Sequence, residues 1–236
     1  MREERTVTVD GMPCTVVISD EKEALLAADA AGRASVALWR EGGEFLPAAF
    51  AVERPEDADE EFLERVARRK LGLPWVIAGT ERLILREFGE GDFEEMEAAA
   101  EDSDGLGPDA AVFQNRETFL AYIRRQYPFF LFGIWAAVER ESGRIVGRLG
   151  FGLPEDGREG LELGYHIFAP WRGRGYGKEG CKAALEWQKR ELDLPVYARI
   201  HRENTASQRL AASLGFVRER EPDLENEGDI LHYKMP

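Results

Sequence analysis

The stretch "APWRGRGYGKEGCKAALEW", from Ala169 to Trp187, decides most of what this chain of 236 residues can be. Three glycines and two arginines fall within the six residues from Arg172 to Gly177, and a helical sequence follows at once. The residues before the loop, "LELGYHIFA" (161–169), have the pattern of a strand. The order of strand, glycine loop and helix predicts that the loop lies against a helix N-terminus.

A loop of this kind suits an anion. Amide groups at a helix N-terminus have no partner inside the helix, and the helix dipole is positive there. Glycines let a bulky anion approach the main chain, and Arg172 and Arg174 add positive charge in a protein of formal net charge −14. We therefore predict a phosphate-binding loop. A tight structural turn is the alternative. The loop is not a P-loop, and a dinucleotide fingerprint would need a third glycine at Lys178.

The elements around the loop follow from periodicity and turn residues. The apolar run from Tyr127 to Val138 is rich in aromatic and β-branched residues and is interpreted as a buried strand. Three strands at 129–139, 144–152 and 161–169 are expected to form an antiparallel meander. Before them we expect a strand at 80–88 and helices at 90–103 and 116–126. After the loop we expect a helix at 178–192 with Cys181 in the core, a strand at 195–201, a helix at 204–215, and final strands at 215–221 and 229–236.

Two motifs in order carry a family resemblance. The residues Arg172 to Gly177 fit the pattern Gln/Arg-x-x-Gly-x-Gly/Ala, and "NTASQRLAASLGF" (204–216) follows at a suitable separation. The chain here resembles the GNAT superfamily of acyl-CoA-dependent N-acyltransferases, and with "TERLILREF" (80–88) it looks most like the ribosomal-protein-alanine N-acetyltransferase branch. The resemblance covers residues 80–236. It implies an α/β (α+β) GNAT fold, in which helices flank a mixed, largely antiparallel, splayed sheet.

The resemblance also implies a donor and its binding residues. Acetyl-CoA would be the acyl donor, with no metal. Its pantetheine arm would lie in the gap beside the strand 163–168, and its pyrophosphate would lie on the loop amides. Asn204 matches the family asparagine beside the cofactor arm. The implied contacts are Ile167, Phe168, Ala169, Arg172, Gly173, Arg174, Gly175, Tyr176, Gly177, Lys178 and Asn204.

Catalysis of acetyl transfer to an amine needs a group that accepts the amine proton. Glu162 is the candidate base, since the family often places a glutamate on this strand; a solvated strand residue is the alternative. Many family members carry a tyrosine seven residues after the motif asparagine, and Ala211 stands there in this chain. Ser207 or water could then donate a proton to the leaving thiolate, or the thiolate could leave without an acid. Tyr165 and Tyr233 are further possibilities, whereas His166 and His201 are expected to be packed or surface residues.

The expected reaction is direct transfer of an acetyl group to a primary amine, either a small amine or a peptide N-terminus. The alternative is a non-catalytic acyl-CoA-binding sensor whose N-terminal domain serves as the partner-binding or output module. The acidic group Glu101, Asp102 and Asp104 falls where the family lines its acceptor side, and a solvated loop is the other interpretation.

The first part, residues 1–75, is expected to be a separate small α/β domain of βαβ type. A strand at 15–20, a helix at 21–32, strands at 35–40 and 48–53 and a helix at 55–72 are expected in that order, and the boundary lies near Leu71–Thr80. The stretch 18–38 weakly resembles the late half of a haloacid-dehalogenase-type fold. Asp20 would end a strand there, but no upstream DxD motif exists, so phosphatase chemistry is not supported. Asp20 is expected to be a turn and helix-cap residue.

Composition restricts partners and location. A net charge of −14 argues against nucleic acid and anionic membranes, and it is compatible with a cationic substrate such as an amine. Two cysteines, Cys14 and Cys181, cannot form a disulfide framework, so a reduced cytoplasmic setting is expected. The segment "MREERTVTVDG" is no signal peptide. The oligomeric state is not predicted.

Overall fold

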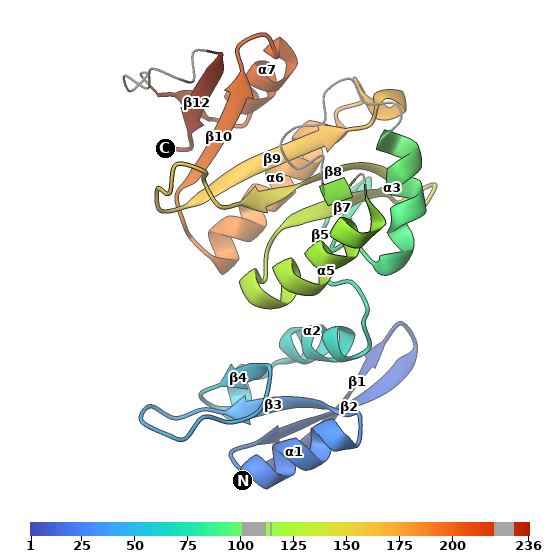
Figure 1. The fold of residues 1–236 in the computed structure, drawn as a ribbon, viewed down its shortest axis with the longest axis vertical. Coiled ribbons are helices and arrows are strands. Elements are labelled where there is room, and N and C mark those ends of the chain that lie inside the picture. The colour runs from blue at the N-terminus through green and yellow to red at the C-terminus, as the bar shows by residue number, and fades with distance from the viewer. Residues whose placement is uncertain (101–111, 114, 220–228) are drawn as a thin grey trace. The chain divides into compact units, whose positions relative to one another are not determined.

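A computed structural model describes residues 1–100, 112–113, 115–219 and 229–236. The chain divides into two compact units, an N-terminal unit Met1–Trp75 and a C-terminal unit Val76–Pro236 (Figure 1). Within the described residues, no helix combines the length and the apolar character needed to cross a membrane.

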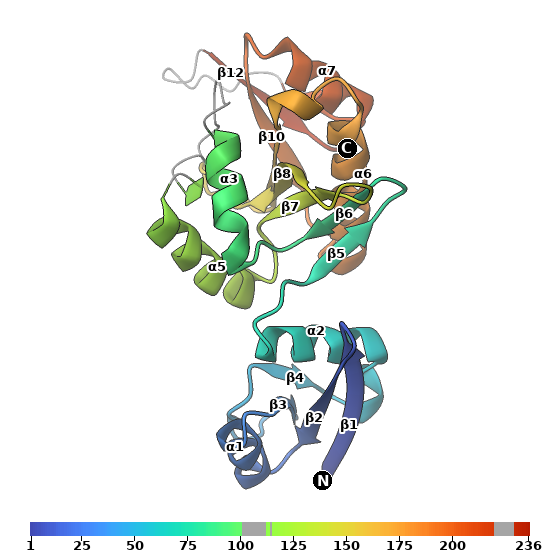
Figure 2. The same cartoon turned by 90° about the vertical axis from the view of Figure 1, so that its right-hand side faces the viewer.

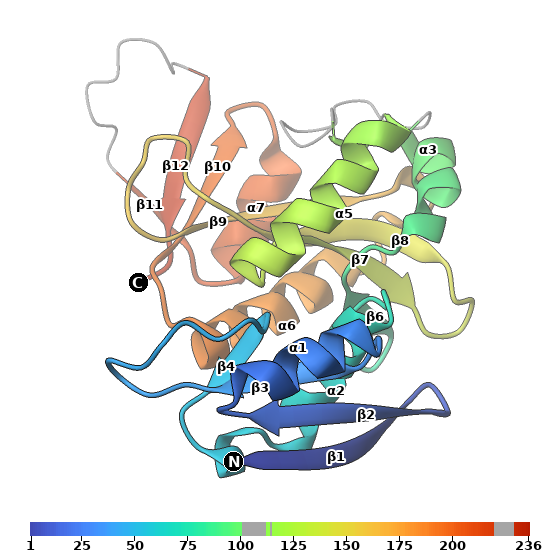
Figure 3. The same ribbon diagram turned by 60° about the horizontal axis from the view of Figure 1, so that its bottom comes forward.

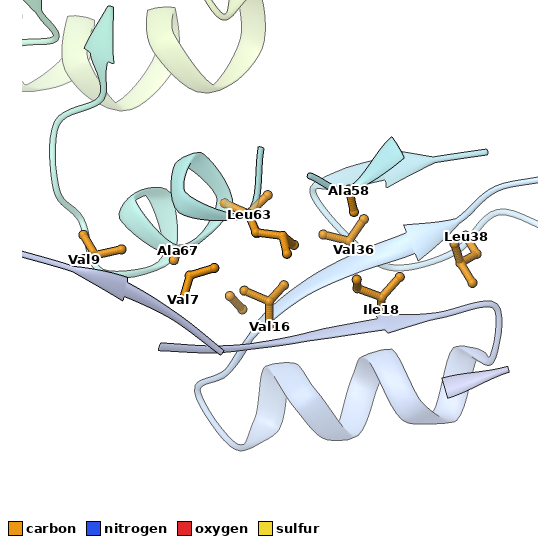
Figure 4. Packing of buried hydrophobic residues seen from close by; sticks show 11 residues of the cluster. Val7, Val9, Val16, Ile18, Val36, Leu38, Ala58, Leu63 and Ala67 are labelled. Carbon is orange, nitrogen blue, oxygen red and sulfur yellow. The ribbon is translucent and has the colours of Figure 1, made fainter. Parts of the chain in front are cut away.

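The N-terminal unit is a four-stranded sheet in the order β1-β2-β3-β4, with one helix on each face (Figure 4). Strands β1 (Arg2–Val9) and β2 (Met12–Ser19) form an antiparallel hairpin, whereas β3 (Ala34–Leu38) and β4 (Phe50–Val52) add in parallel. Helix α1 (Lys22–Ala30) follows β2, and the short helix η1 (Pro55–Asp57) and α2 (Glu60–Lys70) follow β4. The parallel part matches the expected order of elements, and β1 is an addition to it.

The core of this unit lies between α2 and the sheet (Figure 4). Helix α2 begins at the N-cap Asp59, whose side chain accepts from Phe62 N, and it turns Leu63, Val66 and Ala67 toward the strands. The aliphatic residues that meet them from the sheet are Val7, Val9, Val16, Ile18, Ala34, Val36 and Leu38.

Asp20 does not cap α1, contrary to expectation. The N-cap of α1 is Glu21 and makes no side-chain cap, and it is Ser19 Oγ that accepts from Glu21 N at 3.0 Å. The Asp20 carboxylate instead pairs with the N-terminal ammonium and lies 3.3 Å from Arg40 Nη2. This ammonium is close because β1 pairs with β2 along its whole length.

The described residues of the C-terminal unit contain an eight-stranded sheet in the order β11-β12-β10-β9-β8-β7-β6-β5. All neighbouring strands are antiparallel except β9 and β10. The strands are β5 (Val76–Gly79), β6 (Leu83–Arg86), β7 (Ile134–Glu139), β8 (Ile145–Gly152), β9 (Leu161–Ile167), β10 (Val196–His201), β11 (Val217–Arg218) and β12 (Ile230–Lys234). The mixed, largely antiparallel sheet and its central meander agree with the prediction.

Helices cover both faces of this sheet (Figures 2 and 3). The short helix η2 (Glu90–Asp92), α3 (Phe93–Ala100) and α5 (Arg116–Phe130) lie on one face, and α6 (Tyr176–Glu191) and α7 (Thr205–Ser213) lie on the other. On the α5 face, Phe88, Phe113 and Phe119 pack together. On the α6 face, Trp135 packs edge-on against Trp187 at 4.9 Å, and Cys181 is fully buried as expected.

The apolar run Tyr127–Val138 is not one strand, so that prediction was wrong. Its first part forms the last turn of α5 with Pro128 inside the helix, and only Ile134 onward belongs to β7. Tyr127 fixes this arrangement, because its buried hydroxyl donates to Ile134 O at 2.6 Å and accepts from Phe88 N at 3.1 Å. Leu131, at φ 62°, then reverses the chain. Similarly, the expected strand 80–88 is shortened to Leu83–Arg86, because Thr80–Arg82 forms the turn after β5.

Candidate functional site

Strands β9 and β10 are adjacent for only two residues and then separate (Figure 1). Leu161 pairs with Val196 and Glu162 with Tyr197, and no further pair between these strands is formed in the described residues. Beyond that point β9 continues along β8 to Ile167, whereas β10 continues along β12 to His201. The sheet therefore opens between the two strands immediately after Glu162.

The glycine loop lies between the end of β9 and the start of α6. The short helix η3 (Ala169–Trp171) leads into it, and Gly173 and Gly175 adopt the left-handed φ values of 75° and 85°. Gly175 is the N-cap of α6, and the first amide with an acceptor there is Glu179 N, which donates to Gly175 O at 3.1 Å. The three helical amides before it have no acceptor within the helix. Free amides beside the positive end of the helix dipole can bind an anion.

Arg82, in the turn before β6, holds this loop in place. Its Nη1 donates to Arg174 O at 3.0 Å, and its guanidinium lies 4.6 Å from the centre of the Tyr176 ring. Its Nε donates to Glu179 Oε2 at 2.7 Å. Thr80 Oγ1 donates to the other oxygen of Glu179 at 2.6 Å. The loop is thus fixed from outside by groups that leave its amides free.

Tyr176 contributes to this scaffold through its side chain. The ring is buried, and the hydroxyl donates to the Glu139 carboxylate. That hydrogen bond raises the pKa of Tyr176, with burial acting in the same direction. Of the predicted contacts, Tyr176 can therefore offer a ligand its amide but not its hydroxyl.

The cations of the loop are exposed, as a phosphate site requires. Arg174 lies 5.0 Å from the Trp171 ring centre, and Lys178 lies exposed in the first turn of α6. Arg172 bends back toward β9, where its Nε donates to Ile167 O at 2.9 Å. The Arg172 amide donates to Ala169 O at 3.2 Å, so it is not among the free amides.

The predicted pantetheine contacts Ile167, Phe168 and Ala169 end β9 and begin η3. Phe168 is buried, its N–H donates to Val146 O at 3.0 Å and its C=O accepts from Trp171 N at 2.9 Å. Both the N–H and the C=O of Phe168 are therefore already hydrogen-bonded, to β8 and to η3. Ile167 and Ala169 are half-buried, and their roles as contacts stay predictions.

Glu162 lies at the point where β9 and β10 separate, and it is held there by Arg199. Arg199 Nε donates to Glu162 Oε1 at 3.2 Å and to Oε2 at 3.0 Å. The two side chains are 19% and 17% exposed. Arg199 Nη2 also contacts Glu155 at 2.8 Å. Glu162 is therefore a half-buried, ion-paired carboxylate, and not a freely solvated strand residue.

Helix α7 brings the second motif toward the same opening. The Asn204 carboxamide caps the helix by accepting from Ser207 N at 3.0 Å. Ser207 O accepts from the Tyr165 hydroxyl at 3.1 Å, which joins α7 to β9. A Cβ added at Gly177 would lie 3.3 Å from Leu210 Cδ2 and 3.5 Å from Ile167 Cγ1, so the start of α6 also meets α7 and the end of β9 here.

His166 and His201 differ in their surroundings. His166 is half-buried, and burial together with the charges of Arg148 and Arg172 lowers its pKa to about 4. Arg148, its partner on β8, is buried and lies 4.8 Å from the Phe113 ring centre. His201 is exposed at the end of β10. Tyr165 is also shielded from solvent, and burial raises its pKa to about 12.

Sequence reasoning missed Arg82 and Arg199. Arg199 could have been found, since it alternates with Val196, Ala198 and Ile200 on β10 and so projects to the other face of the strand. Arg82 gives no such signal, because a turn residue finds its partners only in the folded chain. The acidic group Glu101, Asp102 and Asp104 lies outside the described residues. Within the described residues, no group of three or more His, Cys, Asp or Glu side chains could hold a metal ion.

Comparison with known proteins agrees with this geometry. The family model of the acetyltransferase (GNAT) domain matches residues 82–217. The N-acetyltransferase YjdG of Bacillus subtilis, itself described as uncharacterized, is 24% identical over 135 residues, which are 57% of this chain and 80% of that protein.

Solved structures share the fold. An acetyltransferase from Agrobacterium tumefaciens has a TM-score of 0.52 and 22% identity, covering 66% of this chain and 92% of its own. The microcin C7 self-immunity acetyltransferase MccE, solved in complex with acetyl-CoA and AMP, has a TM-score of 0.53 and 14% identity over 66% of this chain and 92% of its own. The family model matches more than half of the sequence, and the chain belongs to the GNAT family of acetyltransferases.

Proposed function

We propose that the protein transfers an acetyl group from acetyl-CoA to a primary amine, which is either a small amine or a peptide N-terminus. The observation that carries the proposal is the opening between β9 and β10, which begins just after Glu162 and runs along β9 toward the glycine loop and the start of α6. A pantetheine-sized arm beside β9 would join a phosphate on the loop to a reacting group near Glu162.

The residues around this opening suit acetyl-CoA. The amides from Gly173 to Lys178 would hold the pyrophosphate, with Arg172, Arg174 and Lys178 supplying positive charge. Ile167, Ala169 and Asn204 would border the pantetheine arm. The complex of MccE with acetyl-CoA shows that this fold can hold that molecule.

Acetyl-CoA, when bound, supplies an acetyl group activated as a thioester. Glu162 accepts a proton from the acceptor amine, directly or through water, so that the nitrogen lone pair becomes free to attack. The half-buried position of Glu162 beside a fixed guanidinium holds the carboxylate in one orientation. Ser207 or water returns a proton to the leaving sulfur. No metal enters this mechanism.

The acceptor remains a choice between two classes. The likeness to the ribosomal-protein-alanine branch favours a peptide N-terminus, and the formal charge of −14 favours any cationic amine. We place the enzyme in the cytoplasm, because both cysteines of the chain are free thiols.

The test is thiol release from acetyl-CoA in the presence of a polyamine, an amino-acid amide and a peptide that begins with alanine. Glu162→Gln should lower kcat by about 100-fold or more, while the acetyl-CoA Kd from calorimetry stays unchanged. Glu159→Gln, an exposed glutamate just before β9, is the matched control and should retain activity.

Acetyl-CoA binding without turnover of any amine by the parent protein would contradict the proposal. That result would favour the acyl-CoA sensor instead.

A further inference from the structure

We infer that Arg199 is a positioning residue for the acetyl transfer, which it serves by fixing the Glu162 carboxylate at the narrow end of the opening and keeping it ionised. The inference rests on the proposed function, in which Glu162 accepts the proton, and it adds a residue to which the sequence assigned no role.

The position of Arg199 in the sheet carries the argument. Tyr197 is the last residue of β10 that pairs with β9, and Arg199 comes two residues later, on the strand that has begun to move away. Its side chain reaches back across the opening to both oxygens of Glu162, at 3.0 and 3.2 Å. The contact therefore spans the gap at its narrow end, and it fixes the base relative to both walls.

Burial and a second ion pair restrain the contact between Arg199 and Glu162. Arg199 and Glu162 are both less than one-fifth exposed. Burial lowers the pKa of Arg199, but the charges of Glu162 and Glu155 more than offset this and leave it raised. Glu155 holds the far side of the guanidinium at 2.8 Å.

Arg158, another arginine near Glu162, pairs with other carboxylates. A small cavity beside it is lined by Asp156, Arg158, Tyr197, His232 and Tyr233. Arg158 pairs with Asp156 and with Glu219 at 2.9 Å. Arg199 forms an ion pair with Glu162 at 3.0 Å. A nearby positive charge favours the ionised form of a carboxylate, so removing Arg199 should make Glu162 easier to protonate.

The experiment is a pH profile of kcat/KM, paired with a carboxyl ¹³C NMR titration of Glu162 that is assigned through Glu162→Gln. In Arg199→Gln, the acidic limb and the NMR midpoint should both move up by about one pH unit. Arg199→Lys keeps the charge and should restore most of the parent midpoint. Arg158→Gln is the matched control, because it removes an arginine of the same cavity that pairs with Asp156 and Glu219, and it should leave the midpoint in place.

The NMR titration tests the role of Arg199, and turnover tests the proposed function, so the two can fail separately. An unchanged NMR midpoint in a folded Arg199→Gln protein would overturn the inference, whether or not the enzyme is active, and so would a midpoint in Arg199→Lys that moves as far as in Arg199→Gln. A shifted NMR midpoint with an acidic limb that does not follow it would also overturn it, because Arg199 would then act on a carboxylate without a part in the reaction. Absence of turnover in the parent would refute the proposed function instead, and the NMR titration would still decide whether Arg199 controls the ionisation of Glu162.

Discussion

Arg82 and Glu179 join the turn before β6 to the first turn of α6, with Arg82 Nε 2.7 Å from Glu179 Oε2. Burial raises the pKa of Glu179, but hydrogen bonds from Thr80 and Arg82 outweigh it and lower the pKa overall. The same guanidinium bonds Arg174 O within the glycine loop. One side chain therefore fixes both the helix and the loop that precedes it.

We predict that Arg82→Gln weakens acetyl-CoA binding, although Arg82 is not itself one of the residues predicted to contact acetyl-CoA. A loop that is no longer held in its binding conformation must be ordered when the ligand binds. The acetyl-CoA Kd from calorimetry should rise up to about tenfold, equivalent to roughly 1.4 kcal/mol of binding free energy. Arg124→Gln, which removes an exposed ion pair between Arg124 on α5 and Glu90 in η2, is the control and should not change the Kd. Equal Kd values for the parent and Arg82→Gln would refute this role.

His166 should make the stability of the protein sensitive to acid. Its pKa of about 4 in the folded state lies below the ordinary value of 6.5, so the unfolded chain binds more protons between these values. Stability from this group is therefore present above pH 6.5 and is lost as the pH falls toward 4. Between pH 6.5 and 4.5 the parent should lose about 2 kcal/mol more than His166→Gln in denaturant unfolding. His201→Gln, at an exposed position, should behave like the parent, and parallel curves for all three proteins would contradict the prediction.

Ala211 occupies the position where many family members carry a tyrosine, and it is only 1% exposed. We predict that Ala211→Tyr does not supply a proton donor but overpacks α7 against the sheet. The free energy of unfolding should fall by about 1–3 kcal/mol, without a gain in turnover. Ala212→Tyr places the same side chain on the exposed face of α7 and should stay within about 0.5 kcal/mol of the parent. Higher turnover in a stable Ala211→Tyr protein would show that there is room for an acid after all.

Leu63 anchors α2 on the sheet of the N-terminal unit and is 3% exposed. Leu63→Ala should lower the stability of this unit by about 2–4 kcal/mol, because it removes buried carbon atoms and leaves a cavity. Hydrogen exchange should report faster opening of the amides in β1 to β4. Leu26→Ala, the same change at a position of α1 that is 49% exposed, is the control. Similar exchange rates in the two variants would mean that α2 contributes little to the core.

The sequence predicted those parts of the fold that local signals determine. Alternating patterns and turn residues predicted the meander β7-β8-β9, and glycines placed the loop before α6. The hairpin of β1 was missed although Asp10–Gly11 is a typical two-residue turn, and these residues adopt φ values of 50° and 81°. The end of α5 was missed for another reason. The apolar run 127–138 contains both helix and strand, and the buried Tyr127 hydroxyl between them bonds not only Ile134 but also Phe88, which lies 39 residues earlier in the chain.

The candidate site was predictable in its position more than in its chemistry. Motif residues on β9, α6 and α7 indicated where a ligand would bind. The groups that hold these residues are Arg82, in the turn before β6, and Arg199, on β10, and both reach their partners only in the folded chain. The main-chain bonds of Phe168 and the inward turn of the Tyr176 hydroxyl likewise depend on tertiary packing, so the sequence could not show which atoms stay free.

The most direct test of the central claim is thermal unfolding with and without acetyl-CoA for the parent, Gly175→Trp and Gly143→Trp. Both glycines have left-handed φ, 85° and 69°, but Gly175 lies in the loop before α6 and Gly143 in the turn before β8. At 100 times its Kd, a ligand stabilises the folded state by about 2.7 kcal/mol, which should raise the midpoint by about 5 °C. We predict this shift in the parent and in Gly143→Trp and its loss in Gly175→Trp. An equal shift in all three proteins would place acetyl-CoA elsewhere, and no shift in the parent at millimolar acetyl-CoA would contradict the account.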